Sequence, residues 1–206
     1  MNRVFVMDDD KKHGDFYPRL LEKKGFEVFA TENAFNFVRY ASELHPDVLV
    51  INSGLIYTDY NRLVDHLVAN HFSDAAPLVV IYGDTARAGH HGVSHYLKEQ
   101  GGLERLSEIA GAYCLGGAKY DVLLLDDYLP EENGEQTAAV KELNVSFFDV
   151  YDLHAAQMFL RKNAVRSVVI HSLPEKYETL KRDLGFENTF YVEKLSNIAD
   201  LKGILQ

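Results

Sequence analysis

The sequence has no tryptophan and only one cysteine in 206 residues. The lone Cys114 excludes an internal disulfide, and no Cys-x-x-Cys pair is present for a zinc or dithiol site. No run approaches the ~20 apolar residues that a membrane-spanning helix needs, and the short apolar stretch at the N-terminus does not have the length of a signal peptide. We therefore expect a soluble, cytoplasmic protein that does not bind a membrane.

Basic residues are also scarce. The chain has 21 Lys and Arg but 31 Asp and Glu, which gives a formal net charge of −10. Such a chain repels phosphate backbones, so we expect no nucleic-acid partner. The sequence also lacks a G-x-G-x-x-G after its first apolar run, a P-loop and a G-x-S-x-G motif. These absences leave nucleotide binding and serine-hydrolase chemistry without support.

The first half of the chain alternates short apolar runs with stretches of helical spacing. The runs have the length and composition of strands buried on both faces, and they lie at residues 4–7, 27–30, 48–51 and 78–81. Strands that alternate with helices over short connections predict an α/β fold with an open, doubly wound parallel sheet. In such sheets the polar residues just beyond the carboxyl ends of the strands form the default site.

The same pattern restarts after Gly116 and Gly117. Apolar runs recur at residues 122–125, 145–148, 168–170 and 190–192, with helical spacing between several of them. The sequence therefore predicts two α/β units in tandem, residues 1–112 and a shortened unit over residues 119–206.

Four segments of the first unit, in order, resemble the receiver domain of response regulators. They are residues 3–10, 20–28, 46–52 and 92–98. The resemblance implies a flavodoxin-like fold and a role in two-component, phosphorelay signalling. It also implies that an acidic pair after the first strand holds Mg²⁺ beside a phosphoacceptor Asp at the end of the third strand.

The residues at those positions depart from the family's pattern. Asn52 stands at the acceptor position, and its neutral amide is a very poor nucleophile for phosphoryl transfer. Tyr82 replaces the small Ser or Thr on the fourth strand, and Lys98 falls one residue early for the lysine that senses phosphate. Only the acids Asp8 and Asp9 remain, as a candidate Mg²⁺ site or as acids that cap the following helix. The pattern predicts a pseudo-receiver that requires no cofactor.

The second unit can be aligned with a receiver in two registers. In the first, Asp126 and Asp127 are the acidic pair and His171 stands at the acceptor position, 44–45 residues later. That spacing matches the 43–44 residues from the acids of the first unit to its acceptor position. His171 would then be a phosphoryl acceptor, a metal ligand or a hydrogen-bonded structural residue.

In the second register Asp126 itself is the phosphoacceptor. Ser172 and Lys194 then fall at a receiver-like mutual spacing. This alignment leaves the acidic pair without a source inside the unit and needs a long insertion. We favour the first register and keep the second, because it alone supplies a usable acceptor.

The leading hypothesis is a non-catalytic signalling protein that acts through a protein partner or self-association. Tyr82 is expected on an exposed or half-exposed docking face. The Phe35–Phe37 stretch is expected to pack in the core, with a contribution to a partner surface as the alternative. An enzymatic alternative is a phosphatase resembling the haloacid dehalogenases, with Asp8 as nucleophile and Asp10 as acid/base, because the two residues fit a bare Asp-x-Asp pattern.

Overall fold

The computed structural model describes residues 2–10, 16–71, 77–83, 93–97, 99–127 and 145–193. The chain divides into two compact units, Met1–Gly116 and Gly117–Gln206. Within the described residues, no helix combines the length and the apolar character needed to cross a membrane.

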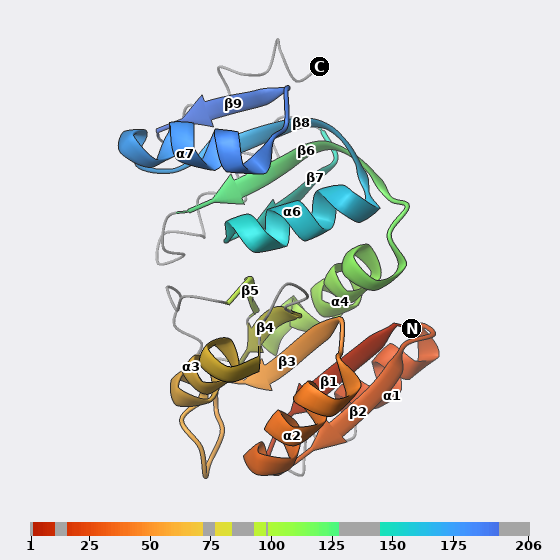
Figure 1. The fold of residues 1–206 in the computed structure, drawn as a ribbon. Coiled ribbons are helices and arrows are strands. Elements are labelled where there is room, and N and C mark those ends of the chain that lie inside the picture. Colours follow the sequence, from red (N-terminus) through yellow and green to blue (C-terminus); the bar gives the residue numbers. More distant parts are fainter. Residues whose placement is uncertain are drawn as a thin grey trace. The chain divides into compact units, whose positions relative to one another are not determined.

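The first unit is built on a five-stranded, fully parallel sheet (Figure 1). Its strands are β1 (Arg3–Met7), β2 (Glu27–Thr31), β3 (Val48–Asn52), β4 (Leu78–Tyr82) and β5 (His95–Leu97). Their order in the sheet is β2-β1-β3-β4-β5, the flavodoxin-like order of doubly wound proteins. The predicted α/β fold of this unit is confirmed.

Helices cover the sheet of the first unit. They are α1 (Phe16–Lys23), α2 (Ala34–Leu44), α3 (Tyr60–His71) and α4 (Glu99–Ala110), and α4 continues into the π-helical turn η1 (Gly111–Leu115). Helix α2 begins where Asn33 accepts a hydrogen bond from the backbone N–H of Asn36 at 3.1 Å, a standard N-cap contact. Helices α2 and α3 contact each other, and α1 contacts α4.

Alternate residues of the strands serve the two faces of this sheet. Phe5, Leu49 and Val79 belong to a buried cluster with Phe37 of α2 and Leu63 of α3. In β1, β3 and β4 the alternating residues that point to the opposite face are also buried. These three strands are therefore apolar on both faces. This burial explains why the strands read as continuous apolar runs in the sequence.

The second unit has a four-stranded parallel sheet. Its strands are β6 (Lys119–Asp126), β7 (Phe147–Val150), β8 (Ala164–His171) and β9 (Thr189–Val192), in the order β7-β6-β8-β9. Counted along the chain this is the order 2-1-3-4, which the first four strands of the other unit also follow. The two sheets therefore share one topology up to the fifth strand.

Two helices lie on one face of the second sheet (Figure 1). They are α6 (Leu153–Lys162) and α7 (Pro174–Leu184). Asp152 caps α6 by accepting the N–H of Ala155 at 2.8 Å, and α7 starts on Pro174 and ends at Gly185 in the left-handed conformation. Phe159 of α6 stacks on Phe148 of β7 with ring centroids 4.4 Å apart, which fixes α6 on the sheet.

Asp121 ties the start of β6 to the segment before β7. Its carboxylate accepts hydrogen bonds from the hydroxyl of Ser146 at 2.7 Å and from the backbone N–H of Ser146 at 2.9 Å. These bonds, with a smaller contribution from the charge of Arg166, hold the pKa of Asp121 below its ordinary value. The bonds stabilise the fold only while the carboxylate is ionised.

We expect Ser146→Ala to destabilise the protein more at neutral pH than in acid, where only the bond from the Asp121 N–H to the Ser146 hydroxyl is still lost. A lowered pKa in the folded state contributes stability above the unfolded-state pKa, and this contribution disappears as pH falls through the folded-state pKa. The site is solvent-accessible, so the loss at pH 7 should stay under about 1 kcal/mol. Urea unfolding of both proteins from pH 7 down to about pH 2 checks this, and a pH-independent difference would contradict it.

Candidate functional site

The polar site of the first unit lies where its sheet changes winding direction. Successive connections lead from β1 outward to β2 and then back to β3, so the switch point lies between β1 and β3. Ligands of doubly wound sheets bind outside the carboxyl ends of the strands at this point. Asp8 and Asp9 follow β1 directly, and Asn52 ends β3. The structure thus brings these three predicted residues to one edge.

Asp8 is the centre of this edge and is only 3% exposed. Its Oδ1 accepts the Nδ2–H of Asn52 at 3.0 Å and the backbone N–H of Asp10 at 3.0 Å. Its Oδ2 accepts the hydroxyl of Tyr82. Neutral donors within the unit therefore solvate this buried carboxylate, as burial of a charge requires.

Asp9 is held by the loop that follows β3. Its carboxylate accepts the backbone N–H of Ile56 at 2.9 Å and that of Tyr57 at 3.0 Å. Asp9 therefore fixes the loop after β3, a role that the sequence pattern did not indicate.

Tyr82 is 2% exposed, so the expectation of an exposed or half-exposed ring was wrong. Its ring packs 4.4 Å from that of Tyr17 on α1, and its hydroxyl reaches Asp8. The next residue, Gly83, has φ of 120°, and a Cβ there would lie 2.6 Å from Ser53 Oγ and 3.1 Å from Asn52 Oδ1. Glycine is therefore needed both for the backbone conformation and for the close approach to this edge.

The contacts of Asp8 bear on the predicted Mg²⁺ site. Mg²⁺ needs oxygen atoms in near-octahedral geometry, whereas Asn52 and Tyr82 direct hydrogen atoms at Asp8. A cation that took the Oδ1 and Oδ2 positions now bonded to Asn52 and Tyr82 would have to displace these donors. No group of three or more His, Cys, Asp or Glu that could hold a metal ion occurs among the described residues. Mg²⁺ at Asp8 and Asp9 stays a prediction.

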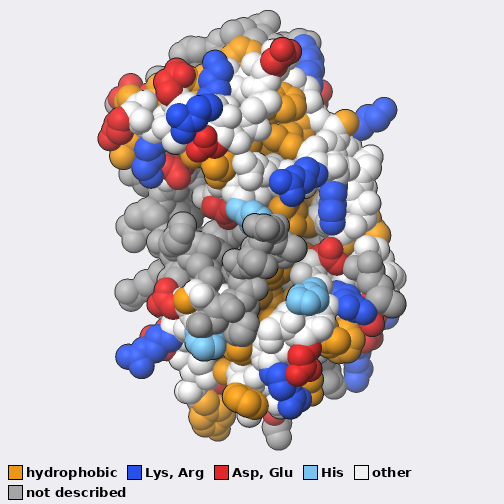
Figure 2. Space-filling view, in the orientation of Figure 1, with side chains coloured by type: hydrophobic (Ala, Val, Ile, Leu, Met, Phe, Trp, Pro, Cys, Tyr) orange, Lys and Arg blue, Asp and Glu red, His pale blue; other side chains and the backbone are white. Residues whose placement is uncertain are grey.

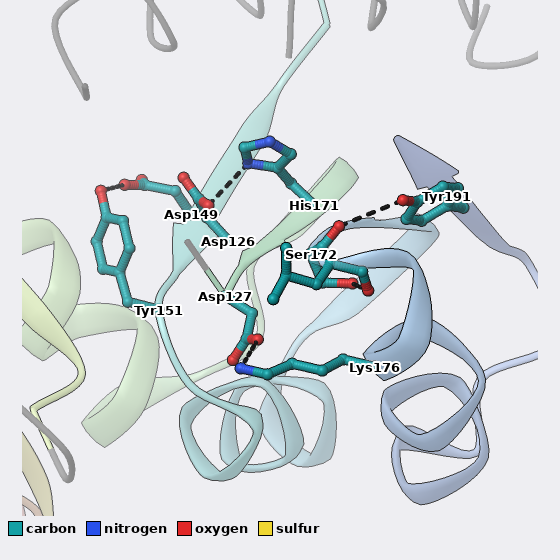
Figure 3. A network of polar contacts seen from close by, with 9 residues as sticks. Asp126, Asp127, Asp149, Tyr151, His171, Ser172, Lys176 and Tyr191 are labelled. Atoms are coloured by element: carbon teal, nitrogen blue, oxygen red, sulfur yellow. Dashed lines mark hydrogen bonds and ion pairs between the residues drawn. The ribbon is translucent and has the colours of Figure 1, made fainter. Parts of the chain in front are cut away.

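The second unit places a buried pair at the matching edge (Figure 3). His171 ends β8 and faces Asp126 at the end of β6, with His171 Nδ1 2.9 Å from Asp126 Oδ1. Asp126 is 2% exposed, and both side chains are nine-tenths buried. The two residues are also direct partners in the strand register. Carboxylate and imidazole thus satisfy each other here, as carboxylate and amide do in the first unit.

Asp127 and Ser172 lie beside this pair but point to other partners (Figure 3). Asp127 accepts a hydrogen bond from Lys176 Nζ at 2.7 Å. The Ser172 hydroxyl donates to the carbonyl of Leu173 at 3.1 Å, and the Ser172 carbonyl accepts the Tyr191 hydroxyl at 3.3 Å. Lys176 was missed in the sequence because it lies on α7, several residues beyond the strand end.

Strand order favours the first of the two registers. In the β7-β6-β8-β9 sheet, β6 occupies the place that β1 has in the first unit, and β8 occupies that of β3. Asp126 then corresponds to Asp8, and His171 corresponds to Asn52. In the second register β6 would be the third strand of its unit, and its neighbour β7 would have to be the first. However, β7 follows β6 in the chain.

The remaining predicted site residues divide into two groups. Lys98 and Lys194 lie outside the described residues. Asp10 donates its backbone N–H to Asp8, so the two acids of the phosphatase pattern are joined through the backbone. Asp8 is also buried and hydrogen-bonded, which leaves it poorly placed as a nucleophile.

No family model and no curated protein matches this chain. Among solved structures, it is similar to a response regulator receiver domain from Bermanella marisrubri at 18% identity and a TM-score of 0.43, over 52% of this chain and 96% of that one. A response regulator from Burkholderia pseudomallei aligns at 15% identity and a TM-score of 0.45, over 78% and 93%.

A third solved structure extends across both units. It is described as a two-component system response regulator/GGDEF domain protein, and it aligns at 12% identity and a TM-score of 0.47 over 98% of this chain and 97% of that one. These three solved structures are a receiver domain and two response regulators.

Proposed function

We propose that this protein is a non-catalytic signal-transduction protein built from tandem receiver-like units that acts through protein–protein contact. The observation that carries the proposal is the Asn52 amide, which stands at the acceptor position and donates to the buried Asp8. An amide so engaged supplies no anionic oxygen to attack a phosphoryl group. The first unit is then a pseudo-receiver whose surface remains available to a partner protein or a second copy.

The second unit gives further support. At the place equivalent to Asn52 it has His171, which is bonded to Asp126. Under this proposal the pair is a structural element that satisfies two buried polar groups. Asp126 is the one alternative phosphoacceptor that we retain, because it is a carboxylate at the carboxyl end of a central parallel strand.

Phosphorylation with acetyl phosphate and Mg²⁺ tests the proposal. We expect the intact mass of the full chain to stay unchanged, because neither unit offers an accessible acceptor. A stable gain of about 80 Da, one phosphoryl group, would contradict it. If that adduct disappears in Asp126→Asn but persists in the neighbouring control Asp127→Asn, the second register is correct and the protein is phosphorylated in its second unit.

A further inference from the structure

A groove with an apolar floor runs between α2 and α3 of the first unit. Its volume is about 610 Å³, which is within the usual range for small-molecule sites. Four apolar residues line it: Ala34, Phe35 and Val38 of α2, and Leu63 of α3. We call this surface the α2–α3 groove. Ala34, Thr58 and Arg62 place it at the first turns of α2 and α3, beside the loop that Asp9 holds, and none of the residues that contact Asp8 line it.

Helical spacing explains how the groove forms. Phe35, Val38 and Arg39 are three and four residues apart on α2, so they share one face of that helix. Arg62, Leu63 and His66 form the corresponding flank of α3. Phe37 and Leu63 reach the core, whereas Phe35 is 76% exposed. The expectation that both phenylalanines pack in the core therefore failed for Phe35, which instead extends apolar surface into solvent.

Basic side chains border this apolar surface. Arg39, Arg62 and His66 all line the groove, in a chain whose formal net charge is −10. Over α2 and α3, Figure 2 shows hydrophobic side chains beside Lys or Arg and His side chains. Apolar residues with a few convergent polar groups are the usual composition of a ligand site. The positive charges of Arg39 and Arg62 favour a ligand that carries negative charge.

Arg39 has only weak contacts on its own helix, the first of them with the ring of Tyr40, whose centroid lies 4.8 Å from Arg39 Cζ. Arg39 Nε lies 4.0 Å from Glu43 on the next turn of α2, and both side chains are about half exposed. Such a surface pair is weak and exchanges readily. Arg62 makes no hydrogen bond or ion pair with the residues that the structure describes, and the nearby Asp59 accepts the backbone N–H of Asn61 at the start of α3. A guanidinium without a partner is well suited to bind a carboxylate.

We propose that the α2–α3 groove binds a small amphipathic carboxylate. The alkyl or aromatic part lies on Val38 and Leu63 under Phe35, and the carboxylate is held by Arg62 with Arg39. Apolar contact supplies most of the affinity, and the charges select the anion. Such a site would give the first unit a non-covalent input that is independent of phosphoryl transfer.

Calorimetric titration of the full chain tests this with three probes that share one alkyl chain. They are laurate and dodecyltrimethylammonium, each used below its micelle concentration, and dodecanol, used below its solubility limit. We expect laurate to bind with one site per chain, dodecanol more weakly and the cation not measurably. Equal binding of the anion and the cation would overturn the proposal, and so would a failure of laurate to bind.

Variants locate the binding. Arg62→Glu is expected to weaken laurate binding by about tenfold or more, because a charged hydrogen bond is replaced by like-charge repulsion. The matched control Arg161→Glu makes the same charge change on α6 in the second unit and should bind laurate like the parent. If Arg62→Glu perturbs the fold, Phe35→Ser, at a highly exposed position, should still weaken binding several-fold. An equal loss in the control would overturn the proposal, as would binding only to phosphatidylglycerol vesicles.

Discussion

Replacing Asn52 with aspartate is expected to destabilise the first unit by about 3–5 kcal/mol at pH 7 in the absence of divalent cations. The substitution restores the residue that a receiver has at this position, yet here it removes the Nδ2–H that Asp8 accepts at 3.0 Å. Two carboxyl groups would then face each other in a buried site, where they either repel as two anions or must take up a proton at pH 7, and both cost free energy.

The same substitution should make stability depend on Mg²⁺. The new carboxylate, Asp8 and Asp9 together would supply the oxygen ligands that a divalent cation prefers. We therefore expect Mg²⁺ to raise the free energy of unfolding of Asn52→Asp as its concentration increases, and to leave the parent protein almost unchanged. Urea unfolding followed by circular dichroism, with and without Mg²⁺, measures both effects.

The exchanged double variant Asp8→Asn with Asn52→Asp is the matched control. It keeps one carboxylate and one amide at the same two positions, so a donor again faces an acceptor. We expect it to recover most of the stability lost in the single variant, with a coupling energy that a double-mutant cycle reports. Parent-like stability of the single variant without Mg²⁺ would mean that the Asn52–Asp8 hydrogen bond does not hold this edge.

Truncation of Phe37 to alanine is expected to cost about 3–5 kcal/mol, the usual range for a phenylalanine deleted from a packed core. Phe37 is 0% exposed and lies among Phe5, Leu49 and Leu63 between α2 and the sheet. Removal of the Phe37 ring leaves a cavity that the surrounding side chains can fill only partly. The free energy of urea unfolding measures the loss.

Phe35→Ala provides the comparison on the same helix. This side chain is 76% exposed, so its loss should change stability by no more than about 0.5 kcal/mol. The two substitutions remove the same atoms, and any difference between them therefore reports burial. Similar losses at both positions would place Phe35 in the core and leave the α2–α3 groove without its exposed wall.

The fold could be predicted because its signals are local and repeated. Residues 48–52 and 78–82 are apolar at nearly every position, and strands buried on both faces require that composition. The alternation with helices then leaves few topologies other than the parallel sheet that is observed. The convergence of Asp8, Asp9 and Asn52 followed from the same argument, because carboxyl ends of parallel strands share one edge.

What could not be predicted depends on side-chain direction and on loops. A tyrosine at the end of a strand can lie in solvent or turn inward, and only the partners of Tyr82, the ring of Tyr17 and the carboxylate of Asp8, decide its burial. Asp9 is bound by the backbone N–H groups of Ile56 and Tyr57. Nearly every residue has a backbone N–H group, so no sequence motif indicates which of them will bind a side chain. The exposure of Phe35 depends on which side of α2 the sheet covers, and it is Phe37 and Ala41 that face the sheet.

The hydrogen bonds around Asp8 also determine how the first unit can respond to its surroundings. A conformational switch requires two states of similar free energy and a ligand that prefers one of them. Asp8 already accepts hydrogen bonds from Asn52, Tyr82 and Asp10, so this carboxylate has donors without an external cation. On the proposed function, the occupancy of the partner surface then follows the concentrations of the chain, its partner and any ligand of the α2–α3 groove.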